Sequence, residues 1–417
     1  MTQPNTADLQ FANDDVLLKE MYKGNRLEDA FMRKMPFLAV IPKDTGMMGR
    51  KQMVPIVYSE GTGRSNTFAQ AQAYDASPST DAWELNHINS YGYGTIAGDA
   101  MDFSKSSAGA VIPKLKLLVD TRLHQMAKHL NITLFRDGNG AIGTDDGTWT
   151  SPGKSITLSD PYEISNFEVG MELKTGTAHG SPDTGSTTIE SINRSTGTLT
   201  SDTAIDSDIS AFATGDYIYP IGDAYDGSSY KVVHGLSYWV PSSAPSDSTF
   251  GIDRSLDSRL GGLRLDASSY PTVEEAILTA ASECEIQQGS PDLFVLHPKQ
   301  FIRMVKELGS RVRYERMQAQ GSKGASARVG FSSIVVDAPS GPINVLADPF
   351  CPSLYGWCLE KSKCRLYSNG KWPKWISEDG SKLLRLSADD GFEFRLVGRG
   401  QFCVSIPGHC CHVTMPT

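Results

Sequence analysis

The chain has 417 residues, of which 39% are hydrophobic and 21% are charged, and its formal net charge is −9. This balance argues against wholesale disorder, and the length suffices for two or three packed cores. The first residues lack the basic start and apolar run of a signal peptide, and no apolar stretch reaches the ~20 residues that span a bilayer, so we expect a cytoplasmic product without a membrane partner.

Residues 13–35 are predicted to form a helix with a weak point at Gly24. Asn13 can cap its start, the acidic residues that follow suit a helix N-terminus, and Pro36 is expected to end it. The apolar positions form a ragged stripe that is broken near Gly24. We therefore interpret this segment as a bent arm laid across a neighbouring chain.

Two β-like runs follow, GRKQMVPIVYSEG and AWELNHINSYGYGTIAG, with a small, polar stretch between them. Two strands joined by such a long excursion predict an extended hairpin with little core of its own. Isolated two-stranded ribbons are marginal in water, so we expect this one to lean on another subunit.

Residues 106–137 carry the strongest helical signal, because apolar residues recur at helical spacing from Leu115 to Leu130. Such a helix is more than about 30 Å long and is typical of a scaffold strut. His124 and His129 lie about one helical turn apart, as two metal ligands do, but no acidic third partner is near them in the sequence. We interpret them as polar positions on the strut.

Residues 146–222 hold 11 acidic and three basic side chains, a net charge of −8, so most of the charge of the chain lies here. Short β-like runs alternate with Gly, Asn, Asp and Ser turns, and residues 195–197 (STG) are predicted to form a hairpin turn. We expect a separate, small β-rich module that projects into solvent.

From about residue 223 the pattern is mixed α/β. Residues 271–289 are predicted to form a helix and residues 292–297 a buried strand. Pro298 opens a second helix, whose buried face is predicted to comprise four apolar residues. These four residues are Phe301, Ile302, Val305 and Leu308. Further strands follow, among them GFEFRLVGRG and QFCVSIPG near the end.

The seven cysteines are interpreted as buried thiols. The run His409-Cys410-Cys411-His412 contains residue types that bind zinc, but it lacks the spacing of a zinc site. Adjacent residues of a strand point to opposite faces, so these four side chains cannot converge on one ion. The aspartates at 202–216 lack a calcium-loop pattern. Ser151 and Lys154 match S-x-x-K only within a Pro-Gly turn. We expect no catalytic residues, no metal and no cofactor, and hence no enzyme.

The order of these elements resembles that of tailed-bacteriophage major capsid proteins with the HK97-type fold. The resemblance rests on five segments together with the acidic insert: TIAGDAMDFSKSSAGAVIPKLKLLVDTRLHQMAKHL, GIDRSLDSRLGG, PDLFVLHPKQF, GPINVLADPFCP and DGFEFRLVGRGQFCVSIPGHCCHV. It implies an α+β fold with five parts. These are an N-terminal arm (1–45), an extended loop or E-loop (46–104), a spine helix (105–145), an inserted all-β domain (146–222) and peripheral and axial domains (223–417).

The resemblance also implies a function and a set of contacts. The chain is expected to form hexamers and pentamers of itself in an icosahedral shell around double-stranded DNA, which the near-neutral body contacts weakly. Scaffolding, portal and decoration proteins are further expected partners. Because the first residues resemble the arm, either the scaffold is a separate protein or the chain is already processed, and Met1 makes a separate scaffold the simpler expectation. The expected inter-subunit contact residues are Arg50, Lys51, Arg64, Phe31 and Met35. For any one of the three cations, ordinary solvated charge is the favoured interpretation, since exposed pairs contribute only ~0–1 kcal/mol.

Two other functions stay open at this point. One is a nanocompartment shell of encapsulin type, which has the same fold and a protein cargo. The other is a glycan-binding or adhesin protein centred on the β-rich module. The acidic insert and the long arm favour the virus over the nanocompartment.

Overall fold

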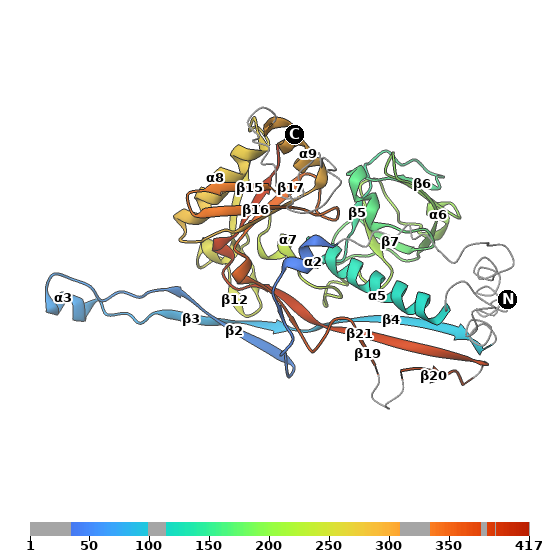
Figure 1. The fold of residues 1–417 in the computed structure, drawn as a ribbon, viewed down its shortest axis with the longest axis horizontal. Coiled ribbons are helices and arrows are strands. Elements are labelled where there is room, and N and C mark those ends of the chain that lie inside the picture. The colour runs from blue at the N-terminus through green and yellow to red at the C-terminus, as the bar shows by residue number, and fades with distance from the viewer. Residues whose placement is uncertain (1–34, 99–113, 309–333, 377–381, 388, 417) are drawn as a thin grey trace, which may run out of the picture.

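The computed structural model describes residues 35–98, 114–308, 334–376, 382–387 and 389–416. Its described part contains three larger sheets, several helices and one long hairpin that extends away from the rest of the molecule (Figure 1). The predicted arm helix lies outside the described residues apart from Met35, and so does the start of the helix predicted at 106–137. No helix among the described residues is both long and apolar enough to cross a membrane.

The hairpin consists of two antiparallel strands and a short helix at its tip: β2 (Lys51–Ser59), β3 (Ser79–Asn86) and α3 (Phe68–Ala73). This pairing confirms the hairpin that the sequence predicted. At its base Trp83 and Leu85 are buried in the main core, whereas no residue from 57 to 82 is buried in the described chain. The outer part of the hairpin therefore has no core of its own.

A second sheet underlies the body and is organised around one long strand. Its strands are β1 (Lys43–Asp44), β18 (Cys364–Ser368), β21 (Gly391–Val404), β19 (Lys374–Trp375), β20 (Leu384–Arg385) and β4 (Ile88–Ala97). Two of the predicted runs merge into β21, which pairs with β4 from Gly391↔Ala97 to Gly400↔Ile88. Conversely, one predicted run is split at His87, where the chain leaves β2 and begins to pair with β21.

The long helix α5 (Lys114–Thr133) has 20 residues and lies across this sheet. Glycine in β4 permits the close approach, because a Cβ on Gly92 would lie 2.6 Å from Met126 Sδ. Val119 and Met126 of the helix are buried with Phe394 and Leu396 of β21. The predicted strut thus rests on the strand that organises the sheet.

A short helix, α2 (Pro36–Val40), precedes the hairpin. Pro36, which was expected to end a helix, is the first residue of this one, a position where its missing N–H costs nothing. The backbone N–H of Phe37 donates to the buried carboxylate of Asp348 at 3.0 Å, and Asn131 of α5 donates to the same carboxylate at 3.2 Å. One buried acid therefore joins α2, α5 and the C-terminal half of the chain.

Another sheet is formed by strands that all fall between residues 143 and 220. They run in the order β5 (Gly143–Thr144), β10 (Tyr217–Pro220), β7 (Glu172–Gly176), β8 (Thr187–Asn193), β9 (Thr198–Ser201) and β6 (Ser155–Thr157). Asn193 and Thr198 are paired across the predicted turn at 195–197, where Gly197 has φ +72°, which confirms the turn. The sheet is drawn in green in Figure 1, beside the end of α5.

The third large sheet is mixed and belongs to the C-terminal half. Its order is β13 (Leu263–Asp266), β22 (Cys411–Thr414), β17 (Tyr355–Leu359), β14 (Leu293–Leu296), β16 (Gly341–Ala347) and β15 (Ile334–Ala338). Every residue of β14 is buried, as predicted for 292–297. All seven cysteines are buried free thiols, as predicted, and Cys411 opens β22, which lies between β13 and β17.

Two helices cover this sheet: α8 (Val273–Ile286) and α9 (Pro298–Leu308). Thr272 caps α8 by accepting from the N–H of Glu275 at 3.2 Å, and two glutamates in the first turn favour the positive end of the helix. Of the predicted buried face of α9, Ile302 is exposed and Phe301 and Val305 are only half-buried, whereas Gln300 and Met304 are the buried residues of the helix; the side chain of Leu308 lies outside the described part of the chain. The helix is rotated because Gln300 donates to two backbone carbonyls at the end of the sheet.

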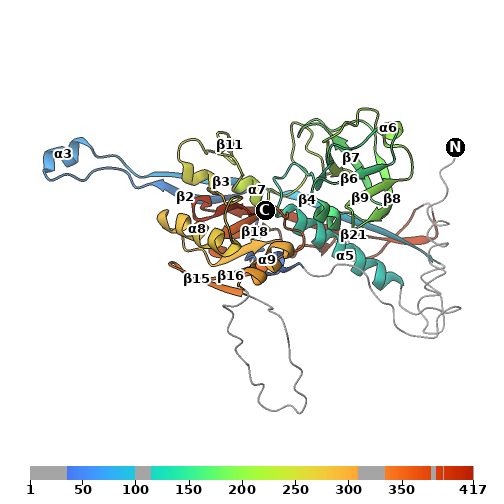
Figure 2. The same ribbon diagram turned by 90° about the horizontal axis from the view of Figure 1, so that it is seen from above.

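The remaining elements are short and connect these layers: η2 (Pro161–Asn166), α6 (Ile205–Asp208), α7 (Leu236–Trp239), β11 (Ser248–Thr249), β12 (Ile252–Asp253), η3 (Ser258–Gly261), η4 (Lys361–Lys363) and η5 (Pro407–His409). Seen from above, the hairpin and the β-rich sheet lie on opposite sides of the C-terminal layer (Figure 2).

Candidate interaction surfaces

The three cations predicted for inter-subunit contacts all lie on the hairpin or at its start. Arg50, Lys51 and Arg64 are exposed. Lys51 forms an ion pair with Glu84 of its own chain, across the β2–β3 ladder. Cross-strand pairs of this kind contribute less than about 1 kcal/mol, so Lys51 remains free to change partner.

Of the two apolar residues predicted for inter-subunit contacts, the structure describes only one. Phe31 lies outside the described residues. Met35 is half-buried and packs against the main core, so its own chain already covers part of it.

Exposed apolar residues cluster on the outer hairpin, and sequence reasoning missed them. Phe68, which opens the tip helix α3, and Tyr74, which follows it, are 83% and 70% exposed, and Met53 and Val57 of β2 are exposed as well. Large apolar side chains gathered on a projecting element mark an interaction surface. Two aromatic residues within an otherwise small and polar stretch, SNTFAQAQAYDAS, were the available signal.

The base of the hairpin is fixed to the body by Trp83. Its ring is fully buried and meets Trp239 edge to face at 5.2 Å, and its Nε1 donates to the carbonyl of Ser405 at 3.0 Å. The N–H of Glu84 also donates to the carbonyl of Phe250 at 2.8 Å. The hairpin thus leaves the body from a rigid base.

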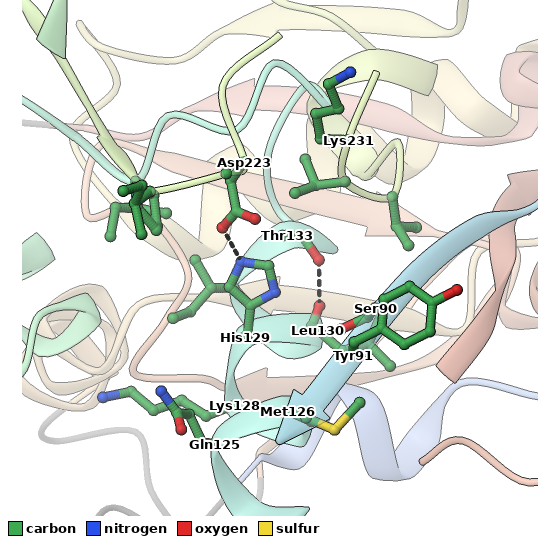
Figure 3. A pocket seen from close by; sticks show the side chains of 18 of the residues that line it. Ser90, Tyr91, Gln125, Met126, Lys128, His129, Leu130, Thr133, Asp223 and Lys231 are labelled. Atoms are coloured by element: carbon green, nitrogen blue, oxygen red, sulfur yellow. Dashed lines mark hydrogen bonds and ion pairs between the residues drawn. The ribbon is translucent and has the colours of Figure 1, made fainter. Parts of the chain in front are cut away.

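A groove of about 830 Å³ lies between β4, α5 and the β-rich module. Figure 3 shows Tyr91 of β4 on one side and Lys231 on the other, with α5 forming the floor. Tyr91 and Tyr93 are exposed there, and Val169 and Ile221 of the module contribute further apolar surface. The groove is therefore a second apolar surface that is open to solvent.

His129 of α5 and Asp223 form an ion pair at 2.7 Å inside this groove (Figure 3). Burial opposes the charged ring, but the negative charge of Asp223 and its hydrogen bond raise the pKa of His129 above 6.5. Sequence reasoning missed this pair because 94 residues separate the two side chains. Only the fold brings the acidic partner to the helix.

Two further ion pairs join α5 and the turn after it to the module. Lys128 donates to Glu168 at 2.5 Å, and Arg136 pairs with Glu163 at 2.8 Å. Burial lowers the pKa of Lys128 and raises that of Glu163, while the partners act in the opposite direction. We call the three pairs, including His129 with Asp223, the α5 seam.

The structure provides no metal site among the described residues, since it brings together no group of three or more His, Cys, Asp or Glu side chains that could hold an ion. Of the C-terminal run, His409 is hydrogen-bonded through Nδ1 to the carboxylate of Glu360 at 2.7 Å. The rings of His412 and Trp357 meet edge to face, with their centroids 5.5 Å apart. Burial lowers the pKa of His412 to about 4. Cys411 and His412 are therefore packed within the sheet, and His409 lies half-buried just before it.

No protein-family model matches the chain, and no curated protein matches it either. Solved structures do match over nearly its whole length. The capsid asymmetric unit of cyanophage A-1(L) matches with a TM-score of 0.53 and 10% identity, covering 96% of this chain and 98% of that one. The capsid of Myoviridae phage XM1 gives a TM-score of 0.48 at 6% identity, covering 94% and 96%, respectively.

The SrpI encapsulin of Synechococcus elongatus PCC 7942 gives a TM-score of 0.46 at 9% identity, covering 99% of this chain and 96% of that one. The match to the cyanophage capsid subunit confirms the predicted α+β class and the HK97-type capsid fold. Because this match covers 96% of the chain, the described hairpin, strut and sheets belong to one architecture.

Proposed function

We propose that this chain is the major capsid protein of a tailed phage and that copies of it assemble, as hexamers and pentamers, into an icosahedral shell around double-stranded DNA. The observation that carries the proposal is the hairpin. Its outer part, residues 57–82, exposes Val57, Phe68 and Tyr74 and has no core of its own, so it gains a core only against another molecule.

The capsid fold supports this reading, because thin shell walls consist of subunits that overlap one another. An interface between identical subunits arises wherever such an element covers a neighbour. The parts proposed are those that the sequence predicted: an arm at 1–45, an extended loop at 46–104, a spine helix within 105–145, an insert at 146–222 and the remaining domains at 223–417. The exposed cations Arg50, Lys51 and Arg64 are proposed to face carboxylates of the neighbour.

The proposed role is structural and involves no catalysis. Charge supports DNA as an enclosed cargo that the wall contacts weakly, since residues outside 146–222 carry close to no net charge. Scaffolding, portal and decoration proteins are proposed partners, with assembly in the host cytoplasm and residence in the virion.

Electron microscopy and sedimentation of the expressed full chain, alone and with candidate scaffolding proteins, test the proposal. We expect closed shells of uniform size. A monodisperse small oligomer under every condition would contradict it. Nuclease-protected DNA in particles recovered from infected cells supports the phage function, whereas particles that contain a single protein cargo and no DNA would support the nanocompartment instead.

A further inference from the structure

A second apolar groove, about 630 Å³ in volume, runs along the outer side of α9. The side chains of Ile302, Leu354 and Tyr162 that line it are 54%, 46% and 45% exposed. Ile302 belongs to the side of the helix that the sequence predicted to be buried. A contiguous apolar surface rimmed by polar residues is typical of an interaction site. We call this surface the α9 groove.

The rim of the α9 groove is positively charged. Lys299 and Lys306 are exposed on either side of Ile302, at helical spacing, and neither forms an ion pair with any residue that the structure describes. Lys299 lies 5.0 Å above the ring of Tyr162. Arg303, by contrast, is already paired with Glu307 at 2.8 Å. The groove therefore presents two unpaired cations around an apolar centre.

The solvent face of α8 has the complementary character. This helix contains four glutamates and no basic residue. At its C-terminal end Glu283 and Glu285 are exposed without an ionic partner in the described chain, and Ile286 beside them is 66% exposed. We call these three residues the α8 ridge. An acidic ridge that carries one apolar residue matches a basic groove with an apolar floor.

The two surfaces lie at opposite ends of strand β22. Just after the ridge, Gly289 lies against His409, two residues before β22 begins. A Cβ on Gly289 would be 3.0 Å from the Cα of His409. Beside the groove, Gln300 and Arg303 donate to the carbonyl of Pro416, which follows the strand, at 3.3 and 2.7 Å. Both views place α8 toward the hairpin and α9 toward the β-rich module (Figures 1 and 2). A chain cannot join its own ridge to its own groove.

We propose that the α8 ridge of one copy docks into the α9 groove of the next copy, with Ile286 beside Ile302. The two ridge carboxylates then face Lys299 and Lys306. An apolar centre with charged residues at its rim is the usual composition of a protein interface, and the charges select the correct orientation of the partner. The inference rests on the proposed assembly into a shell and identifies one contact that builds it.

Because the two surfaces differ, the contact is head to tail and repeats from copy to copy. Contacts of this type close into a ring when the rotation between copies allows it. Each chain in such a ring uses its ridge once and its groove once. This property distinguishes the contact from a two-fold symmetric one, in which a single surface is used twice.

Cysteine cross-linking tests the proposal on the full chain. The variant Ile286→Cys/Ile302→Cys is assembled and then oxidised, and the products are resolved without reductant. We expect a ladder of covalent trimers and larger species, because each chain is linked to two neighbours. The native cysteines are all buried, so they contribute little background. Each single-cysteine variant should give at most dimers. The same is expected of the matched control Leu256→Cys/Ile302→Cys, in which the replaced Leu256 is 63% exposed.

Particle formation, scored in the same samples, separates this inference from the proposed function. Particles with the ladder support both. Particles without the ladder overturn the proposed docking and still support the proposed assembly into a shell. A ladder without particles supports the docking and overturns the shell, and the absence of both overturns both.

Charge reversal provides a second test that does not depend on cysteine chemistry. Glu283→Lys/Glu285→Lys and, separately, Lys299→Glu/Lys306→Glu should each reduce the assembled fraction by about tenfold or more, because like charges then face each other. The chain that carries all four changes should assemble again. If the chain with all four changes does not assemble although circular dichroism shows that every variant is folded, the proposed pairing is contradicted.

Discussion

At the scale of single residues, Trp83 serves both the hairpin and the main core. The hairpin needs a rigid base, and the main core needs a large apolar side chain at the point where β3 crosses it. The indole ring satisfies both, since it is fully buried against Trp239 and its one polar atom donates to the carbonyl of Ser405. A smaller side chain would leave a cavity that the surrounding rings cannot fill.

Trp83→Ala is therefore expected to lower the free energy of unfolding by about 3–5 kcal/mol, measured by chemical denaturation of the unassembled chain. Trp83→Phe is the matched control. It keeps most of the apolar volume and loses the hydrogen bond to Ser405, so a loss of about 1 kcal/mol is expected. An alanine variant as stable as the phenylalanine variant would show that the ring does not anchor the hairpin.

At the scale of elements, the hairpin combines a buried base with an exposed outer part. Its outer residues cost little to change in the isolated chain, because surface substitutions alter stability by less than about 0.5 kcal/mol. The same residues become buried if the hairpin covers a neighbour. Stability and assembly should thus respond to different halves of one element.

Phe68→Ser at the tip is expected to leave the melting temperature of the unassembled chain unchanged and to reduce the yield of particles severalfold, since it removes apolar area from the proposed interface. Light scattering and electron microscopy measure the yield. Leu256→Ser, at another exposed apolar residue, should assemble normally. Equal yields for Phe68→Ser and the wild type would argue against a role of the tip in assembly.

At the scale of the whole molecule, the α5 seam sets how the β-rich module sits on the body. The seam contains one histidine whose charge depends on pH near neutrality. The pKa of His129 is raised in the folded chain, so the ion pair with Asp223 stabilises the fold fully below pH 6.5. This contribution is lost as the pH rises through the raised folded value.

His129→Gln should therefore lower the melting temperature most at pH values below 6.5, by the equivalent of about 1 kcal/mol, and least under alkaline conditions. Thermal unfolding of both proteins at matched pH measures the difference. His124→Gln, on the same helix but without an ion pair among the described residues, is the control. A difference between wild type and His129→Gln that does not change with pH would contradict the role of the ion pair.

The sequence predicted those features of the molecule that depend on local patterns. Alternation and turn residues identified the hairpin and the turn at 195–197, and the buried strand at 292–297 followed from its apolar run. Features that depend on distant partners were not accessible. The pairing of His129 with Asp223 needs the whole insert to fold back, and the change of partner at His87 needs β21, which begins only at Gly391.

The same distinction explains the errors on α9 and on the interaction surfaces. Periodicity alone cannot choose between two apolar sides of a short helix, and at Ile302 the hydrogen bonds of Gln300 decide. The predicted cations Arg50 and Arg64 have the expected exposure, but the exposed aromatic residues of the tip are defined only once the fold shows what remains uncovered.

The long strand β21 also has a mechanical consequence. It runs antiparallel to β4 over ten consecutive residue pairs, and hydrogen bonds in such a ladder lie perpendicular to the strands. Tension along the strands therefore loads the bonds simultaneously, in shear, and does not open them one after another. A wall built from this chain would resist stretching best along β21, so its stiffness under internal pressure should depend on direction.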